Sequence, residues 1–147
     1  MMLVHQNGLV KITEEMPLDK AALIGCGVTT GMGAVFRTAR VEPGSRVCVI
    51  GAGGIGLSAV QAARIAGAGM VIVGDVSESK LDLARRLGAT HTIDASVTDD
   101  VAGAIKDLSG GGVDYSFEAI GRKSTAEQAF AALDVVDEPS EETRRLV

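Results

Sequence analysis

The chain has 147 residues, a formal net charge of −5, no tryptophan, one tyrosine and 19 glycines. This length suits one core-bearing domain rather than two, and the acidic balance argues against a nucleic-acid-binding surface. No apolar run approaches the length of a signal peptide or of a membrane span. We therefore expect a cytoplasmic protein of one domain, with no nucleic-acid partner and no membrane partner.

The N-terminal part of the chain lacks a clear repeating pattern. A short strand is predicted for residues 5–12, and the Met16-Pro17 pair predicts a turn after it. Residues 18–39 have a helical composition in which glycines recur. We predict helical pieces that are interrupted by a bend, which serves either packing or function.

From Val41 onward, short β-branched runs alternate with longer amphipathic runs, the pattern of a parallel sheet with crossover helices. Strands are predicted at residues 46–50, 70–74, 91–94 and 113–118. Helices are predicted at residues 55–66, 79–87, 98–108 and 124–133. Right-handed crossovers place the four strands in the order 3-2-1-4. The sequence thus predicts an α/β fold with a doubly wound parallel sheet of Rossmann type, incomplete because the full fold has six strands.

A glycine-rich loop, Gly51-Ala-Gly-Gly-Ile-Gly56, joins the first predicted strand to the first helix after it. In a dinucleotide-binding loop the first glycine permits the tight turn, the second lets the backbone approach a pyrophosphate, and the third lets helix and sheet pack closely. The helix N-terminus then offers free N–H groups to the phosphates. The predicted cofactor-binding residues of this loop are Gly51, Gly53, Gly54, Ile55 and Gly56.

Asp75 follows the second predicted strand, about twenty residues after Gly56. A carboxylate at this position accepts hydrogen bonds from both hydroxyls of the adenosine ribose and repels a 2′-phosphate. The alternative is an ordinary surface acid at the end of a strand. The first interpretation makes NAD the expected cofactor rather than NADP.

Two cysteines and two histidines are the other candidates for chemistry. Cys48 lies between two valines in the first predicted strand, which indicates structural burial. His5 and His91 have no second metal-binding residue type nearby, so we interpret both as structural or exposed. Cys26, taken alone, is consistent with a small buried apolar residue.

Five blocks of the sequence match one family pattern in order. They are Leu23 to Gly31, Gly51 to Gly56, Gly74 to Lys80, Leu87 to Thr90, and Gly112 to Arg122. Over residues 9–133 the chain resembles the zinc-dependent alcohol dehydrogenases of the medium-chain dehydrogenase/reductase superfamily. The first and last blocks look most like the classes that oxidise primary alcohols or hydroxymethyl adducts of thiols.

The resemblance implies a metal role for Cys26, as one ligand of a catalytic zinc. In such enzymes zinc polarises the alcohol oxygen, and hydride passes from the alcohol to the nicotinamide. The resemblance also implies that Thr30 lines the nicotinamide side and that Lys80 contacts the ribose beside Asp75. Three further residues would flank the adenine: Val76, Ile120 and Arg122. As an alternative, Lys80 and Arg122 are solvent-facing charges.

The resemblance also implies that part of the family pattern is missing. In the family, a second cysteine ligand, a histidine ligand, a proton-relay hydroxyl and a four-cysteine structural zinc lobe precede the matched region. We therefore expect a fragment: residues 1–40 as a remnant of the catalytic domain with its connecting helix, 41–133 as the NAD-binding domain with four strands, and 134–147 as an acidic tail.

Three functions are consistent with these patterns. The leading hypothesis is the NAD-binding portion of a zinc-dependent alcohol dehydrogenase, which converts an alcohol to an aldehyde or ketone but is inactive as this chain alone. A second is a non-catalytic nucleotide-binding module that works with a complementing chain or as a homo-oligomer. A third is a defunct fragment, whose exposed fourth-strand edge predicts aggregation.

Overall fold

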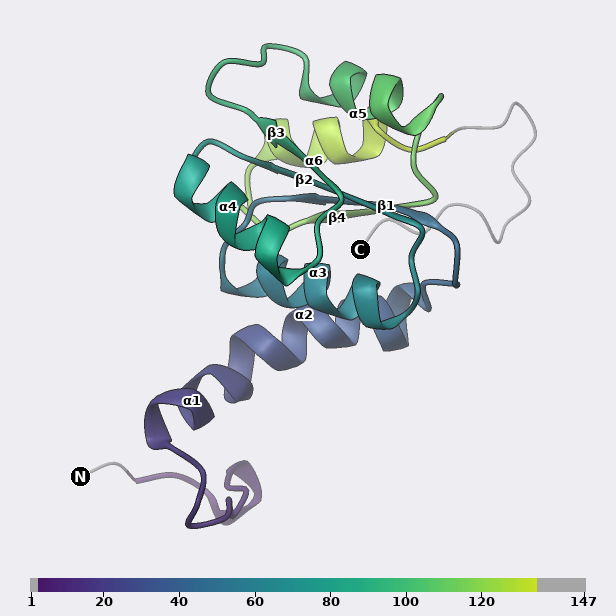
Figure 1. Cartoon of the computed structure of the whole chain (residues 1–147). Helices are drawn as coiled ribbons and strands as arrows, with labels where there is room; N and C mark the ends of the chain where they lie inside the picture. The colour runs from purple at the N-terminus through teal and green to yellow at the C-terminus, as the bar shows by residue number, and fades with distance from the viewer. Residues whose placement is uncertain (1–2, 135–147) are drawn as a thin grey trace.

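The computed structural model describes residues 3–134 and places a parallel sheet at their centre (Figure 1). The strands are β1 (Arg46–Ile50), β2 (Met70–Asp75), β3 (His91–Asp94) and β4 (Tyr115–Glu118). Their order across the sheet is β3-β2-β1-β4, and every pair is parallel. The predicted fold class and strand order are confirmed.

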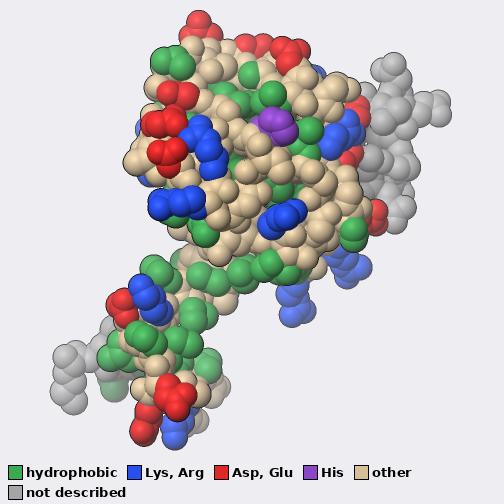
Figure 2. Space-filling view, viewed as in Figure 1, with side chains coloured by type: hydrophobic (Ala, Val, Ile, Leu, Met, Phe, Trp, Pro, Cys, Tyr) green, Lys and Arg blue, Asp and Glu red, His purple; other side chains and the backbone are tan. Residues whose placement is uncertain are grey.

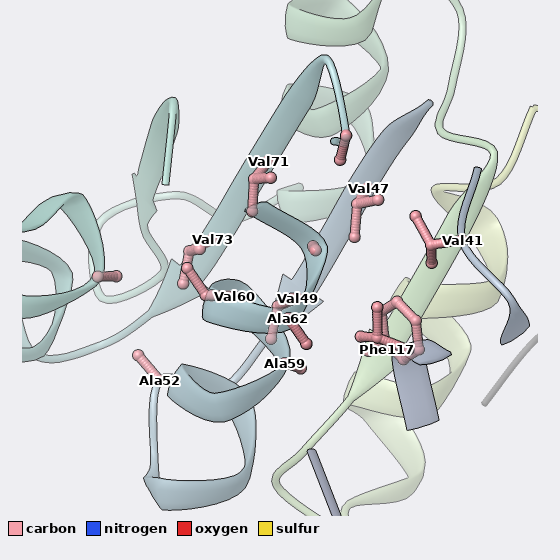
Figure 3. Close-up of a cluster of buried hydrophobic side chains, with 14 of the residues drawn as sticks. Val41, Val47, Val49, Ala52, Ala59, Val60, Ala62, Val71, Val73 and Phe117 are labelled. Carbon is pink, nitrogen blue, oxygen red and sulfur yellow. The ribbon is translucent and has the colours of Figure 1, made fainter. Parts of the chain in front are cut away.

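Helices cover both faces of the sheet, as Figure 1 shows. They are α3 (Gly54–Ile65), α4 (Glu78–Leu87), α5 (Val101–Ser109) and α6 (Lys123–Ala131). On β1, Val47 and Val49 pack with side chains of α3 and α4, whereas Cys48 and Ile50 pack with side chains of α5 and α6. This alternation follows from the two-residue period of a strand. Figure 3 shows side chains of the first of these clusters, which includes Phe117 of β4.

Several predicted boundaries shift by one to three residues. The helix predicted from residue 98 begins at Val101, because the side chain of Asp100 caps it by accepting a hydrogen bond from Gly103 N at 2.8 Å. The last predicted strand begins at Tyr115 rather than Val113. Val113 instead forms an isolated parallel bridge with Leu133 on the other side of β4.

The N-terminal part differs most from its prediction. Residues 5–12 form no strand but a single 3-10 turn, η1 (Gln6–Gly8), closed by a backbone hydrogen bond from Gly8 N to His5 O at 2.9 Å. The side chain of His5 caps the turn by accepting from Asn7 N at 3.2 Å. A strand needs a neighbour with which to exchange hydrogen bonds, and the described sheet contains none for this segment. The prediction of a strand here was wrong. A turn does lie at Met16, whose amide donates to Thr13 O.

The helical pieces predicted within residues 18–39 are present. The segments α1 (Leu18–Leu23), η2 (Ile24–Val28), α2 (Thr29–Gly33) and η3 (Ala34–Ala39) follow one another as one helical run, in which η2 and η3 are π-helical. The residues at each junction keep right-handed helical backbone angles. The run ends at Arg40, whose φ of 52° is left-handed. Within this run, packing requires glycine at Gly31, because a Cβ there would collide with Ile55 O of α3.

Asp134, the first residue of the predicted tail, is bound to the fold. Its amide donates to Val113 O at 3.0 Å, and its carboxylate lies 2.8 Å from Nη2 of Arg46. The rest of the predicted tail, residues 135–147, lies outside the described residues. Within residues 3–134, no helix combines the length and the apolar character needed to cross a bilayer.

Candidate cofactor site

The glycine loop makes the turn from β1 into α3, and its outer glycines are required by packing. Gly51 has a φ of +102°, which favours glycine, and a Cβ there would lie 2.6 Å from Cγ1 of Ile120. A Cβ on Gly56 would collide with Gly51 O. These two positions therefore accept no larger side chain without a shift of the backbone.

In contrast to Gly51 and Gly56, the glycines in the middle of the loop have free space at their Cβ positions. A Cβ on Gly53 or Gly54 would meet nothing within 4 Å. Gly53 caps α3 without a side-chain hydrogen bond, and the first helix amide with a partner is Leu57 N, which donates to Gly53 O at 2.8 Å. The amides of residues 53–56 are therefore free donors among the described residues, and with the positive end of the helix dipole they suit an anion.

Asp75 lies beside this open helix end at the end of β2, with only 6% of its surface exposed. Its Oδ2 accepts a hydrogen bond from Ala52 N at 2.7 Å, and its Oδ1 accepts one from Ser77 N at 2.9 Å. Lys80 Nζ lies 3.7 Å from Oδ2. Each carboxylate oxygen has a further lone pair, so Asp75 is held in one orientation and can still accept from a ligand.

A cleft of about 450 Å³ opens at the carboxyl ends of the strands. Crevices at this edge of a doubly wound sheet are the usual place for ligands. The cleft brings together five of the predicted cofactor residues: Asp75, Val76, Lys80, Ile120 and Arg122. Its lining includes polar residues that the sequence patterns did not indicate: Thr98, Asp99, Ser124, Thr125 and Gln128. The signal that could have indicated them is their position, since they follow β3 and β4 in the chain.

The remaining predicted residues lie outside the lining of the cleft. Thr30 is exposed on α2, and Cys26 is exposed on η2. This helical run packs close to the glycine loop, because a Cβ on Gly27 would lie 3.8 Å from the carbonyl carbon of Gly54. Thr30 and the glycine loop therefore lie on neighbouring helices.

The described residues do not form a metal site. No group of three His, Cys, Asp or Glu side chains within residues 3–134 is placed to hold a metal ion. A structural or catalytic zinc needs three or four protein ligands, and Cys26 has no partner ligand beside it. Cys48 is buried as predicted, and burial raises the pKa of its thiol to about 12, so this cysteine is an apolar core residue.

The sheet order, the glycine loop and the position of the cleft define a Rossmann-type α/β domain. Residues 54–135 match the model of the family described as zinc-binding dehydrogenase. The chain is 44% identical over 126 residues to alcohol dehydrogenase-like 5 of Arabidopsis thaliana, covering 84% of this chain and 32% of that protein. It is also 44% identical over 132 residues to alcohol dehydrogenase class-3 of Zea mays, covering 89% of this chain and 35% of that protein.

Solved structures agree with this match. An alcohol dehydrogenase zinc-binding domain protein from Burkholderia ambifaria superposes with a TM-score of 0.79 at 45% identity, covering 84% of this chain and 33% of that one. Benzyl alcohol dehydrogenase from Acinetobacter calcoaceticus gives 0.80 at 40% identity, covering 85% and 34%. The chain therefore belongs to the zinc-dependent alcohol dehydrogenase family and corresponds to its cofactor-binding domain. It spans about a third of the length of these relatives.

Proposed function

We propose that this chain is the NAD-binding portion of a zinc-dependent alcohol dehydrogenase. The observation that carries the proposal is the open N-terminus of α3, which lies beside the buried carboxylate of Asp75 at the edge of the cleft. The parent reaction would be the reversible oxidation of a small alcohol to an aldehyde or ketone. NAD supplies the hydride acceptor in that reaction.

The residues present suit successive parts of NAD, from the adenine to the nicotinamide. The free amides at Gly53 to Gly56 suit the pyrophosphate, and the remaining lone pairs of Asp75 suit the ribose hydroxyls. The cleft beyond Asp75 has the apolar side chains of Val76 and Ile120 for the adenine. Thr30, beside the glycine loop, would face the nicotinamide end.

The charges at the ribose end favour NAD over NADP. Lys80 lies 3.7 Å from Oδ2 of Asp75, so the carboxylate partly offsets the positive charge that Lys80 would present to a 2′-phosphate. Arg122, at the cleft, would flank the adenine. The carboxylate of Asp75 would repel the phosphate of NADP at short range.

Asp75 provides the test of this proposal. Binding can be followed through the emission of NADH itself. The chain lacks tryptophan, so it adds no tryptophan emission to the signal. The Asp75→Ala substitution should weaken NADH binding by about tenfold and reduce the preference over NADPH, because bonds to a charged acceptor are lost. Circular dichroism would establish that the variant is folded. The control is Asp107→Ala, at an exposed aspartate of α5. Unchanged affinity and unchanged preference in Asp75→Ala would disprove the ribose assignment.

The zinc chemistry of the parent enzyme would need ligands from outside residues 3–134. Cys26 would be one of them, but a single thiolate cannot hold a catalytic zinc. Hydride transfer also needs an alcohol held against the nicotinamide. We therefore propose that the 147-residue chain alone does not oxidise alcohols; zinc-dependent oxidation by the purified chain would contradict this.

A second candidate function is a nucleotide-binding module that works with a complementing chain. The helical run around Cys26 favours it, because Leu18, Leu23 and Ile24 are exposed by 77%, 62% and 41%. Figure 2 shows apolar side chains gathered along this part of the molecule. A partner carrying the other zinc ligands would cover these side chains and restore activity on mixing. Failure of such a partner to bind would exclude this candidate.

A further inference from the structure

Helix N-termini at the cofactor edge of the sheet differ in whether a side chain caps them. At α3, the cap residue Gly53 offers no side chain and the first amides are free. At α5, the carboxylate of Asp100 occupies the end of the helix. At α6, the cap residue Arg122 makes no side-chain hydrogen bond, and the hydroxyl of Thr125 in the first turn donates to the carboxylate of Glu118 from the preceding strand. A side chain therefore caps α5, whereas the cap residues of α3, α4 and α6 make no side-chain hydrogen bond to their helices.

Glu118 is the last residue of β4, and its carboxylate is held from three directions. Oε1 accepts hydrogen bonds from Ile120 N at 2.9 Å, from Gly121 N at 2.9 Å and from Thr125 Oγ1 at 2.7 Å. Oε2 accepts a second, longer bond from Gly121 N at 3.1 Å. One side chain thus joins the end of β4, the turn after it and the first turns of α6.

The turn that Glu118 holds forms one wall of the cleft. Ile120 and Arg122 both line it. The same turn packs against the glycine loop, because a Cβ on Gly51 would lie 2.6 Å from Ile120 Cγ1 and 3.1 Å from Ala119 O. Gly121 has a φ of +83°, which is a left-handed conformation, and its amide donates to both carboxylate oxygens of Glu118. A shift of this turn would change both the adenine wall and the loop proposed to hold the pyrophosphate.

We propose that Glu118 is a positioning residue for the cofactor: its carboxylate folds the turn at residues 119–122 so that Ile120 and Arg122 form the wall of the cleft against the glycine loop. This inference rests on the proposed NAD-binding function. It assigns to Glu118 no contact with the cofactor. Nothing in the glycine pattern requires an acid at the end of the fourth strand, and the role follows from the hydrogen bonds.

Two substitutions separate positioning from general stability. Glu118→Leu removes both acceptor oxygens at similar length, whereas Glu118→Gln keeps an oxygen that can occupy the position of Oε1, where three of the four bonds converge. In the full chain, Glu118→Leu should weaken NADH and AMP by about tenfold each, and Glu118→Gln by about threefold or less. AMP reports on the adenine and ribose end alone. The matched control is Glu127→Gln, an exposed acid of α6 that pairs with Lys123 at 3.6 Å.

Amide hydrogen exchange gives a readout that is independent of the cofactor. Exchange at Ile120 and Gly121 should rise about tenfold or more in Glu118→Leu and stay near the wild-type rate in Glu127→Gln, while core amides such as Val73 are unchanged. Unchanged exchange at the turn would overturn the inference. Wild-type affinity for NADH and AMP in a folded Glu118→Leu variant would overturn the positioning role alone. If the wild-type chain bound neither NADH nor AMP, both the proposed NAD-binding function and the positioning role of Glu118 would be contradicted.

Discussion

Single carboxylates in this chain organise backbone amides that are far apart in sequence. Asp75 holds the amide of Ala52 in the glycine loop, and Asp114 holds the amide of Arg46 at the start of β1 at 2.7 Å. Both bonds connect neighbouring strands at their ends, one at the cofactor edge and one at the opposite edge. Each of these acids therefore fixes the geometry of a strand end in addition to any other role.

The Asp114 site predicts a measurable pH dependence. Burial alone, its largest single influence, would raise the pKa of Asp114, but the hydrogen bonds and charge of Arg46 outweigh it, and the pKa lies below its ordinary value of 3.8. Since the pKa is lowered by folding, the stabilisation is present above the ordinary pKa and is lost as pH falls through the lowered value. Asp114→Asn should be less stable than wild type at pH 7 and should lose less stability between about pH 5 and pH 3.

Urea unfolding across this pH range measures the effect. Asp107→Asn is the control, because Asp107 is exposed and makes no ion pair within residues 3–134. It should keep the acid dependence of the wild type. Parallel curves for Asp114→Asn and wild type would show that the bonds from Arg46 to Asp114 do not stabilise the fold.

At the scale of elements, the contact between α2 and α3 positions the N-terminal helical run beside the glycine loop. Gly31 allows the contact, because a Cβ there would collide with Ile55 O and lie 2.7 Å from Cβ of Ser58. Gly33, on the same helix, has nothing within 4 Å of its Cβ position. The two glycines share a helical backbone and differ in their surroundings.

This difference predicts opposite results for two similar substitutions. Gly31→Ala should lower the free energy of unfolding by about 3 kcal/mol, because the two helix backbones must separate. Gly33→Ala should raise it by about 0.5 kcal/mol, because alanine restricts the unfolded chain and fits a helix. Chemical denaturation of both variants measures the two values. Equal effects would mean that the close approach of α2 to α3 does not contribute to stability.

For the whole molecule, the sequence patterns were sufficient where one segment carries its own signal. The four strands, the order β3-β2-β1-β4 and the glycine loop follow from alternation, handedness and spacing. They were insufficient where the outcome depends on a distant partner. The strand predicted for residues 5–12 has no neighbour in the described sheet, and the need for glycine at residue 31 depends on its contact with α3. The role of Glu118 depends on amides and a hydroxyl that only the folded turn brings to it.

We propose that the open end of α3 and the cleft beside Asp75 bind NAD. The most direct test is an amide-resolved NMR titration of the chain with NAD. NAD binding at this site should give the largest shifts at the free amides of Gly53 to Gly56 and further shifts at Val76 and Ile120, with small changes at Asp107 on the exposed side of α5. No saturable shifts, or shifts confined to residues away from the glycine loop and the cleft, would contradict it.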